Sequence, residues 1–489
     1  MIYLFTNTPK IYNDLADVVR LFYDNMPVKL GSEAENADAE IIITHTQQIN
    51  KTKYIEKYTF LQSGKTSDYS YKYAYNQNSD DLLNARTAKR SAKLGLYYAL
   101  KSITGKQLPW GALTGIRPVS LYRQLNTFEN HSAHEQFASI LDVSQTKLNL
   151  VEEIISYQEN IYYKGESPEI DVYIGIPFCP TRCLYCSFIS HDLSKRSAPI
   201  DEYVNCILKE IEMLKFLTEK YSKHIRCIYF GGGTPTTLSH VQMDAIFTAL
   251  SKILDDKCEI TVEAGRVDTI DDDKLKALKK HNVNRISINP QTFNDDTLKL
   301  VNRNHTSKDI FDMLNKVASY HFDSVNMDLI MGLPGETKAH MEHTLACIPN
   351  LPITNLTIHT LAIKRASKIR MNNYQLDYAP EETVAEMIEK ARILASEMGM
   401  KPYYLYRQKY MSGNLENVGY AQKNMQCIYN IDIMEETHNL IAIGAGGISK
   451  RFYYDKNLHT RFANPKSVEH YIENIDKIIE DKKEYYKDF

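Results

Sequence analysis

Tyr-Ile-Gly-Ile-Pro-Phe-Cys-Pro-Thr-Arg-Cys-Leu-Tyr-Cys-Ser-Phe, residues 173–188, is the stretch that decides the fold. It places Cys179, Cys183 and Cys186 in the spacing C-x3-C-x2-C, directly after an apolar, strand-like run from 172 to 176. Thiolates held this close on one loop can face one cubane iron–sulfur cluster. Three protein ligands would leave the fourth iron open to an external chelate. The stretch therefore predicts a three-cysteine [4Fe–4S] site at the end of a strand.

A structural zinc loop, a redox thiol pair and chance clustering are the alternatives. Structural zinc takes four ligands, commonly from two cysteine pairs, and His191 is the nearby fourth donor here. The other cysteines are scattered singly, which argues against a disulfide framework and favours a reducing cytoplasm. They stand at positions 206, 227, 258, 347 and 427.

Composition excludes several classes of protein. A chain of 489 residues is too long for one compact core, and chains of this length typically form about three domains. The formal net charge of -3 and the lack of a long basic tract give no sign of nucleic-acid binding. Residues 1–6 do not resemble a signal peptide, and no run of about 18 apolar residues predicts a membrane span. We expect a cytoplasmic monomer.

The hydrophobic patterns divide the chain into three predicted domains. Residues 1–165 form an N-terminal α+β accessory region with strands near 2–5 and 41–44 and helices near 10–26 and 80–103. Residues 166–375 alternate strand and helix, which implies parallel strands with helices outside and predicts an α/β fold, a partial (βα)6 barrel. Residues 376–489 break this rhythm and are predicted to form a small C-terminal α+β domain. The expected barrel strands are 171–176, 227–230, 259–263, 285–288, 324–330 and 355–361.

Polar and glycine residues follow the predicted barrel strands. Working residues of parallel barrels cluster at the carboxyl ends of the strands. The run Gly231-Gly-Gly-Thr234 would let a ligand approach the backbone, although such a run is more often only a tight turn. Glu263 ends the third strand and could accept hydrogen bonds from ribose hydroxyls. Strand alternation places two polar sets toward the interior, where they need partners: Ser287, Asn289 and Gln291 on the fourth strand, and Asn326 and Asp328 on the fifth.

The cysteine stretch resembles the signature of the radical S-adenosylmethionine superfamily, including the aromatic Tyr185 before the last cysteine. With the strand-end residues, the region from about 170 to 365 resembles the oxygen-independent coproporphyrinogen III oxidases (dehydrogenases). The resemblance implies a [4Fe–4S] cluster on the three cysteines and a pocket for S-adenosyl-L-methionine. The positions implied for the pocket are Tyr173, Tyr185, Gly232, Gly233, Thr234, Glu263, Gln291, Arg303, Asp328, Ile330 and Ala362.

Further segments extend the resemblance over most of the chain, to the HemZ-type branch of that family. They are 108–117, 260–266, 359–367, 403–409 and 413–420. Two positions depart from the oxidase pattern. Phe188 stands where the oxidase has a fourth cysteine, and Gly175 where it has a histidine. The heme-chaperone branch of the family also lacks that fourth cysteine.

The resemblance implies oxidative decarboxylation of coproporphyrinogen III propionates to vinyl groups, in heme (porphyrin) biosynthesis. It also implies an electron donor such as flavodoxin or ferredoxin. The four propionates call for Lys or Arg beside aromatics, and the segments 359–370 and 403–409 supply them. Arg365 and Arg407 are the predicted substrate residues, against the simpler interpretation of a solvated basic surface. The alternative functions are a heme-binding chaperone and a radical enzyme that acts on another tetrapyrrole.

Overall fold

The computed structural model describes residues 1–489 with short gaps and resolves two compact units, 1–151 and 152–489. The gaps are 24–25, 32–38, 51, 75–80, 129–131, 189–190, 195–197, 373, 409–410 and 457. Three domains, with boundaries at 165 and 375, were expected. The structure differs because strands from the last third of the chain join the central sheet.

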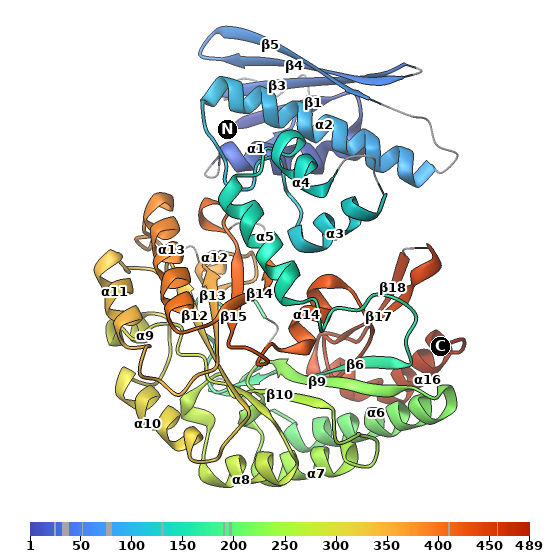
Figure 1. Ribbon diagram of the computed structural model, residues 1–489, viewed down its shortest axis with the longest axis vertical. Helices are drawn as coiled ribbons and strands as arrows, with labels where there is room; N and C mark the ends of the chain where they lie inside the picture. The colour runs from blue at the N-terminus through green and yellow to red at the C-terminus, as the bar shows by residue number, and fades with distance from the viewer. Residues whose placement is uncertain are drawn as a thin grey trace. The chain divides into compact units, whose positions relative to one another are not determined.

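The first unit is built on a mixed five-stranded sheet in the order β2-β1-β3-β4-β5. Strands β1 (Ile2–Thr6), β2 (Val28–Leu30) and β3 (Ile41–Ile49) run parallel, and β3, β4 (Lys53–Gln62) and β5 (Lys65–Ala74) pair antiparallel. Helices α1 (Tyr12–Phe22) and α2 (Asp81–Thr104) share a core with the sheet (Figure 1). The remaining helices are α3 (Pro118–Phe128), α4 (Ala133–Glu135), a π-helix (Gln136–Ile140) and α5 (Gln145–Tyr157), whose end enters the second unit.

The second unit is organised by an eleven-stranded sheet in the order β14-β15-β13-β12-β11-β10-β9-β6-β16-β17-β18. Six predicted strands pair in parallel at its centre. They are β6 (Glu169–Ile176), β9 (His224–Gly232), β10 (Glu259–Glu263), β11 (Arg285–Ser287), β12 (Ser324–Met331) and β13 (Asn355–Thr360). Among the residues that the structure describes, the end strands β14 and β18 do not pair with each other, so the sheet does not close into a complete barrel. This confirms the predicted partial barrel.

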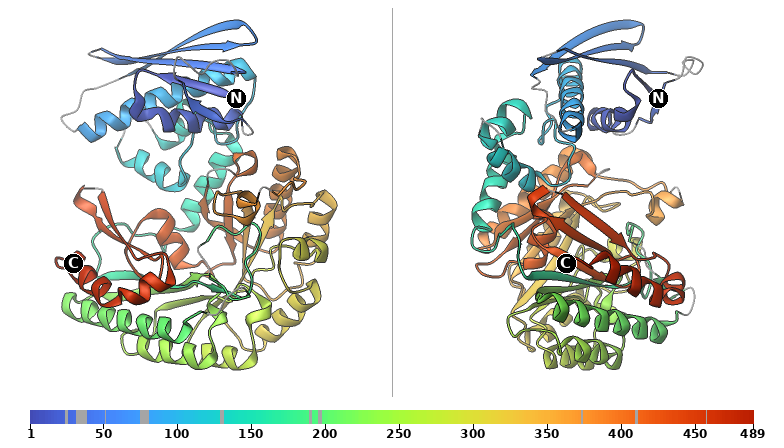
Figure 2. Two further views of the ribbon diagram at one scale, coloured as in Figure 1. Left: turned by 180° about the vertical axis from the view of Figure 1, so that it is seen from behind. Right: turned by 90° about the vertical axis from the view of Figure 1, so that its right-hand side faces the viewer.

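Helices follow the parallel strands and cover the outer side of the sheet (Figures 1 and 2). Their buried faces are apolar; α6, for example, buries Ile207, Ile211 and Leu214. Burial of such a face, rather than intrinsic propensity, supplies most of the stability of a helix in a protein. The helices are α6 (Ile200–Tyr221), α7 (His240–Leu250), α8 (Asp272–Lys280), α9 (Asp295–Leu300), α10 (Ser307–Ala318), α11 (Lys338–Ala346) and α13 (Glu381–Glu397). The short helix α12 (Lys368–Met371) contacts the loop after β6 instead.

The last third of the chain extends this sheet at both ends. Strands β14 (Lys401–Tyr406) and β15 (Asn417–Ala421) continue it beyond β13, and β16 (Asn439–Ile443) pairs in parallel with β6. Strands β17 (Ile448–Tyr453) and β18 (Leu458–Ala463) complete that side. The remaining helices are α14 (Ile428–Glu435), α15 (Val468–Glu473) and α16 (Ile475–Tyr485).

A buried ion pair connects α16, near the end of the chain, to α6 of the barrel. Lys482 Nζ lies 2.5 Å from Glu210 Oε1, and both side chains are fully buried. Glu210 also accepts hydrogen bonds from Tyr471 Oη and from the backbone N–H of Gly444. These bonds satisfy a carboxylate that would otherwise be costly to bury. Within the part of the chain that the structure describes, no helix is both long and apolar enough to cross a membrane.

Candidate cofactor site

The three cysteines lie on the loop that follows β6. Cys179 ends the short strand β7 (Phe178–Cys179), which pairs with β8 (His191–Asp192). Cys179 and Cys183 are buried, and Cys186 is half-buried. Burial raises the pKa of Cys186 to about 11, so this thiol is neutral at pH 7 until a metal or a positive charge favours the thiolate.

The spacing of these donors bears on the zinc alternative. Ligands of one tetrahedral zinc lie within about 4 Å of one another, because Zn–S bonds are about 2.3 Å. In the described parts of the chain, no group of three or more His, Cys, Asp or Glu donor atoms within 4.8 Å includes the loop cysteines or His191. Sulfur atoms that coordinate different irons of a cubane cluster lie further apart than the ligands of one zinc ion. The spacing of these donors therefore fits a cluster better than a zinc site.

Two buried arginines face Cys183. Arg266 Nη1 lies 3.8 Å and Arg303 Nη1 3.9 Å from its sulfur. Arg266 is held by the carboxylate of Asp268 and donates to Thr181 Oγ1 at 2.9 Å. Positive charge at this distance favours thiolate over thiol. The arrangement therefore suits a site with several sulfur anions.

Arg303, predicted for the cofactor pocket, also links the cysteine loop to two strand ends. Its guanidinium donates to Tyr185 Oη at 3.0 Å, to the carbonyl of Gly265 at 2.6 Å and to the carbonyl of Asn289. Tyr185 is thereby fixed between the second and third cysteines. These bonds bring the cysteine loop, the segment after β10 and the segment after β11 into one site.

The glycine run after β9 packs against the cysteine loop. A Cβ at Gly233 would stand 2.6 Å from the carbonyl oxygen of Phe178, so this position requires glycine. The backbone N–H of Thr234 donates to that same carbonyl at 2.8 Å, and its hydroxyl lies 3.5 Å from Cys179 Sγ. Gly232 has φ +106° and passes close to Tyr173 Oη. The run shapes the loop as much as it opens room for a ligand.

Carboxylates at the strand ends keep part of their hydrogen-bonding capacity. Glu263 Oε1 accepts from Tyr229 Oη at 2.6 Å, and burial raises the pKa of Glu263 to about 7. Asp328 Oδ1 accepts from Asn326 Nδ2 at 2.8 Å, and its Oδ2 lies 3.4 Å from His359 Nε2. A carboxylate has about four acceptor sites, so both can accept further bonds from hydroxyl groups.

Gln291 has an unpaired buried oxygen. The residue is 9% exposed and adopts φ +74°, a conformation that side-chain-bearing residues rarely take. Its Oε1 has no hydrogen-bond partner in the structure. An orphaned acceptor with strained backbone at a strand end is the expected mark of a ligand contact.

Apolar side chains complete the site. Ile330 and Leu333 are buried in one cluster, with Tyr185 packed against it. Ala362, half-buried, follows β13 and forms a bridge with Met411. The half-buried Tyr173 stacks against Tyr429 with ring centroids 6.3 Å apart. The predicted pocket residues thus lie on or just after neighbouring strands, and β12 carries both a polar member, Asp328, and an apolar one, Ile330.

The two predicted substrate residues have different surroundings. Arg365 is exposed in the loop after β13. Arg407 is 6% exposed, donates to the carbonyl of Asn414 at 2.9 Å, and burial lowers its pKa to about 10. Lys409, from the same basic segment, lies outside the described residues.

Sequence reasoning missed three contributors to this site. Arg266 ends the segment 260–266, but the sequence alone predicts no role for it. Tyr229 and His359 point inward from the strands on which they alternate with apolar residues, and that alternation was the available signal. His359 contacts Tyr406 Oη through Nδ1 at 3.2 Å, which a linear sequence does not reveal.

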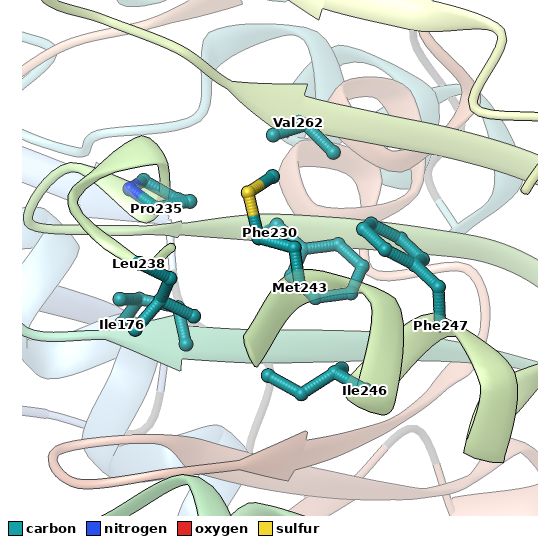
Figure 3. A pocket seen from close by; sticks show the side chains of 8 residues that line it. All are labelled: Ile176, Phe230, Pro235, Leu238, Met243, Ile246, Phe247 and Val262. Carbon is teal, nitrogen blue, oxygen red and sulfur yellow. The ribbon is translucent and has the colours of Figure 1, made fainter. Parts of the chain in front are cut away.

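A separate small cavity lies between the sheet and α7 (Figure 3). Side chains from β6, β9 and β10 face it on one side, and Met243, Ile246 and Phe247 of α7 on the other. All eight lining residues are apolar, so the cavity offers no group that could orient a polar cofactor. It is a packing defect on the outer side of the sheet.

Comparison with known proteins agrees with this geometry. Residues 173–348 match the family model described as "Radical SAM superfamily". The cofactors of that superfamily are a [4Fe–4S] cluster and S-adenosylmethionine, which confirms the predicted cofactors. The fold resembles the crystal structure of coproporphyrinogen III oxidase (HemN) from Escherichia coli, with a TM-score of 0.53, 22% identity, and coverage of 64% of this chain and 70% of that one.

Curated relatives extend the match to the whole chain. The heme chaperone HemW of Bacillus subtilis is 31% identical over 62% of this chain and 75% of its own length. The oxygen-independent coproporphyrinogen-III oxidase-like protein HemZ of the same organism is 34% identical over 97% of this chain and 95% of its own length. The chain therefore belongs to the oxygen-independent coproporphyrinogen-III oxidase-like proteins of the HemZ type, within the radical SAM superfamily.

Proposed function

We propose that the chain is an oxidoreductase that decarboxylates propionate side chains of coproporphyrinogen III to vinyl groups, as a step of heme biosynthesis. The observation that carries the proposal is the three-cysteine loop beside a pocket with unused acceptors, in a chain that HemZ matches over nearly its whole length. When bound, the cluster and S-adenosylmethionine supply a one-electron cleavage that allows hydrogen abstraction from an unactivated carbon.

The residues of the chain bind and position these groups. Cys179, Cys183 and Cys186 hold the cluster, and the two buried arginines offset its negative charge. Glu263 and Asp328 accept hydrogen bonds from polar groups of S-adenosylmethionine.

Gln291 presents its free acceptor to the same ligand, and the apolar cluster around Ile330 and Tyr185 packs against its adenine. The remaining pocket positions are Tyr173, Gly232, Gly233, Thr234, Arg303 and Ala362. Burial of these groups keeps water away from the reacting atoms.

The substrate binds through its carboxylates. Arg365 is exposed and can form a bidentate pair with a propionate. Arg407 reaches a propionate only if the segment that buries it opens. The electron donor is a carrier such as flavodoxin or ferredoxin. We infer a cytoplasmic monomer; the cysteines outside the loop are scattered singly along the sequence, which suits a reducing compartment.

Anaerobic turnover tests the proposal. Reconstituted protein is mixed with coproporphyrinogen III, reductant and S-adenosylmethionine, and products are analysed by mass. We expect loss of carbon dioxide from the propionates and formation of 5′-deoxyadenosine, with neither in Cys183→Ala. Cleavage of S-adenosylmethionine without conversion of coproporphyrinogen, with several electron acceptors tried, would show that the oxidase assignment is wrong.

A heme-binding chaperone is the second candidate. It is favoured by the 31% identity to HemW and by Phe188, which stands where the oxidases have a further cysteine. Titration with hemin separates the two functions. A saturable Soret shift at one heme per chain, without vinyl product in the turnover assay, supports the chaperone. Vinyl product without stoichiometric heme binding supports the oxidase.

A further inference from the structure

Two large exposed apolar side chains, one on the cysteine loop and one on α12, are not used by the proposed cofactor and substrate sites. Phe188, two residues after Cys186, is 65% exposed. Met371, at the end of α12, is 63% exposed. Exposed apolar side chains with charged neighbours are typical of the centre and rim of a protein interface.

Hydrogen bonds join α12 directly to the cysteine loop. The backbone N–H of Ile369 donates to the carbonyl of Leu184 at 3.1 Å, and Lys368 Nζ donates to the carbonyl of Arg182 at 3.1 Å. Arg182 in turn donates to the carbonyl of Ala366 at 2.5 Å. The exposed side chains of α12 therefore belong to the same surface as the loop that holds the cysteines.

This surface is positively charged in a chain whose net charge is negative. The segments 179–194 and 364–372 carry five basic side chains and one acidic one, while the whole chain has a formal net charge of -3. The acidic one, Asp192, lies 3.4 Å from Lys368 Nζ and is thus already compensated. The basic side chains are Arg182, Lys364, Arg365, Lys368 and Arg370.

We propose that Phe188, Arg370 and Met371 form a docking surface for an acidic one-electron carrier protein. The proposal rests on the proposed function, because only a protein that holds a cluster on this loop needs electrons delivered here. One electron passes from the reduced carrier to the oxidised cluster, so the carrier is oxidised and the cluster reduced by one electron each. No bond forms or breaks, and no proton moves. Opposite charge steers the carrier, and the two apolar side chains fix its final position.

Stopped-flow reduction tests the docking surface. Anaerobically reconstituted protein is mixed with an acidic flavodoxin in its hydroquinone form, and bleaching of the cluster is followed at low and high salt. Arg370→Glu and Phe188→Ser should each lower the second-order rate constant about tenfold at low salt. The deficit of Arg370→Glu should shrink in high salt, because salt screens exposed charges. Calorimetric titration with oxidised flavodoxin should show the same ranking of affinities.

The matched control reverses two exposed lysines on the outer helical side. Lys252→Glu/Lys276→Glu changes the net charge in the same direction as Arg370→Glu and by twice as much, and its cluster should still be reduced as fast as that of the wild type. Iron content and bleaching by dithionite should be unchanged in every variant. Equal rate constants in Arg370→Glu, Phe188→Ser and the control would overturn the docking surface. A wild type that binds no iron would instead overturn the proposed function and, with it, the docking surface.

Discussion

Thiols and carboxylates lie at both ends of the parallel strands, but they are paired within the protein at the amino ends and only partly paired at the carboxyl ends. At the amino ends, Asp171 of β6, Cys227 of β9 and Asp432 of α14 are buried together. Asp432 is paired with Arg226 Nε at 3.0 Å and accepts from Thr437 Oγ1 at 2.6 Å. At the carboxyl ends, thiols and carboxylates are left with vacant acceptor sites. Burial alone therefore does not mark a functional site; incomplete internal pairing does.

The amino-end cluster shows why a donor count is insufficient. Asp171, Asp432 and His438 have donor atoms within 4.8 Å of one another, as metal ligands would. Arg226 already supplies the positive charge there, and Cys227 Sγ donates to Asp171 at 3.1 Å. Burial, reinforced by the neighbouring Asp432, raises the pKa of Asp171 well above its ordinary range. The two carboxylates of this cluster are therefore paired within the protein, whereas His438 Nε2 makes no hydrogen bond to the residues that the structure describes and lies 3.7 Å from Glu169 Oε2.

Loss of one cysteine at each end gives the largest expected contrast. Cys183→Ala should abolish the iron and sulfide content of anaerobically reconstituted protein, about four of each per chain in the wild type. Cys227→Ala should leave that content unchanged, since Cys227 only donates to Asp171. Iron, sulfide and the absorbance bleached by dithionite are the measurements. Stoichiometric zinc without iron in the wild type would contradict the assignment of the loop.

Loss of an internal partner should cost stability at the amino end. Arg226→Met leaves Asp432 buried without its cation, and removal of one member of a buried pair costs about 3–5 kcal/mol. Lys209→Met, which removes an exposed pair with Asp476, is the control and should cost far less, because exposed ion pairs contribute little to stability. Urea unfolding gives both values. Equal, small losses would show that Arg226 is dispensable.

At the carboxyl end, the same kind of change should affect binding instead. Glu263→Ala and Asp328→Ala should retain the cluster and weaken S-adenosylmethionine binding. A lost hydrogen bond to a charged group costs about 1.5–3 kcal/mol, or about 10- to 150-fold in affinity. Equilibrium dialysis on iron-loaded protein measures the effect. Unchanged affinity in both variants would mean that the pocket is elsewhere.

Glu263 also predicts a pH dependence. Its pKa is raised from an ordinary 4.5 to about 7 in the folded protein, so the folded state binds more protons than the unfolded state between these values. The free energy of unfolding should therefore fall as the pH rises from about 5 to about 8. Glu263→Gln, compared with the wild type in the absence of S-adenosylmethionine, should remove this part of the slope. If the free energy of unfolding changed with pH equally in Glu263→Gln and the wild type, Glu263 would not be the source of this dependence.

The smallest effect is expected at the substrate arginines. Arg365→Ala should raise the KM for coproporphyrinogen and leave uncoupled cleavage of S-adenosylmethionine nearly unchanged, because its side chain is exposed and is not among the predicted cofactor residues. Arg407→Ala was predicted from sequence to behave in the same way. Because Arg407 is buried, its variant should also lower the melting temperature, and Arg365→Ala should not. A loss of uncoupled cleavage in Arg365→Ala would place that residue in the cofactor pocket.

Local patterns predicted the strands and helices well where the pattern reflects local burial. The runs that became β10 and β12 alternate apolar residues, on the face that the helices cover, with polar residues such as Glu263 and Asp328 on the other face, so the period of a strand is visible in the sequence. The antiparallel pair β4–β5 was missed, although Ser63-Gly64 marks its turn and tyrosines alternate along β5. Those strands are rich in Lys, Ser and Tyr, so the hydrophobic signal is weak.

Long-range pairing could not be predicted from such patterns. Strand β16 pairs with β6 across more than half of the chain, which is why a separate C-terminal domain was expected. The cysteine motif, in contrast, is local. It predicts the cofactors directly, and the match to the radical SAM superfamily confirms them. The contacts of Arg266 and Arg303 with Cys183 join segments that are 83 and 120 residues apart in sequence, and only the fold reveals them.

The position of β6 between β9 and β16 sets an order on the maturation of the protein. The strand that presents the cysteines is synthesised early, but one of its two neighbours begins only at Asn439. Until that residue has left the ribosome, β6 is an edge strand with unpaired backbone groups. Chains that terminate before β16 would therefore leave β6, the strand that leads into the cysteine loop, on an edge prone to aggregation.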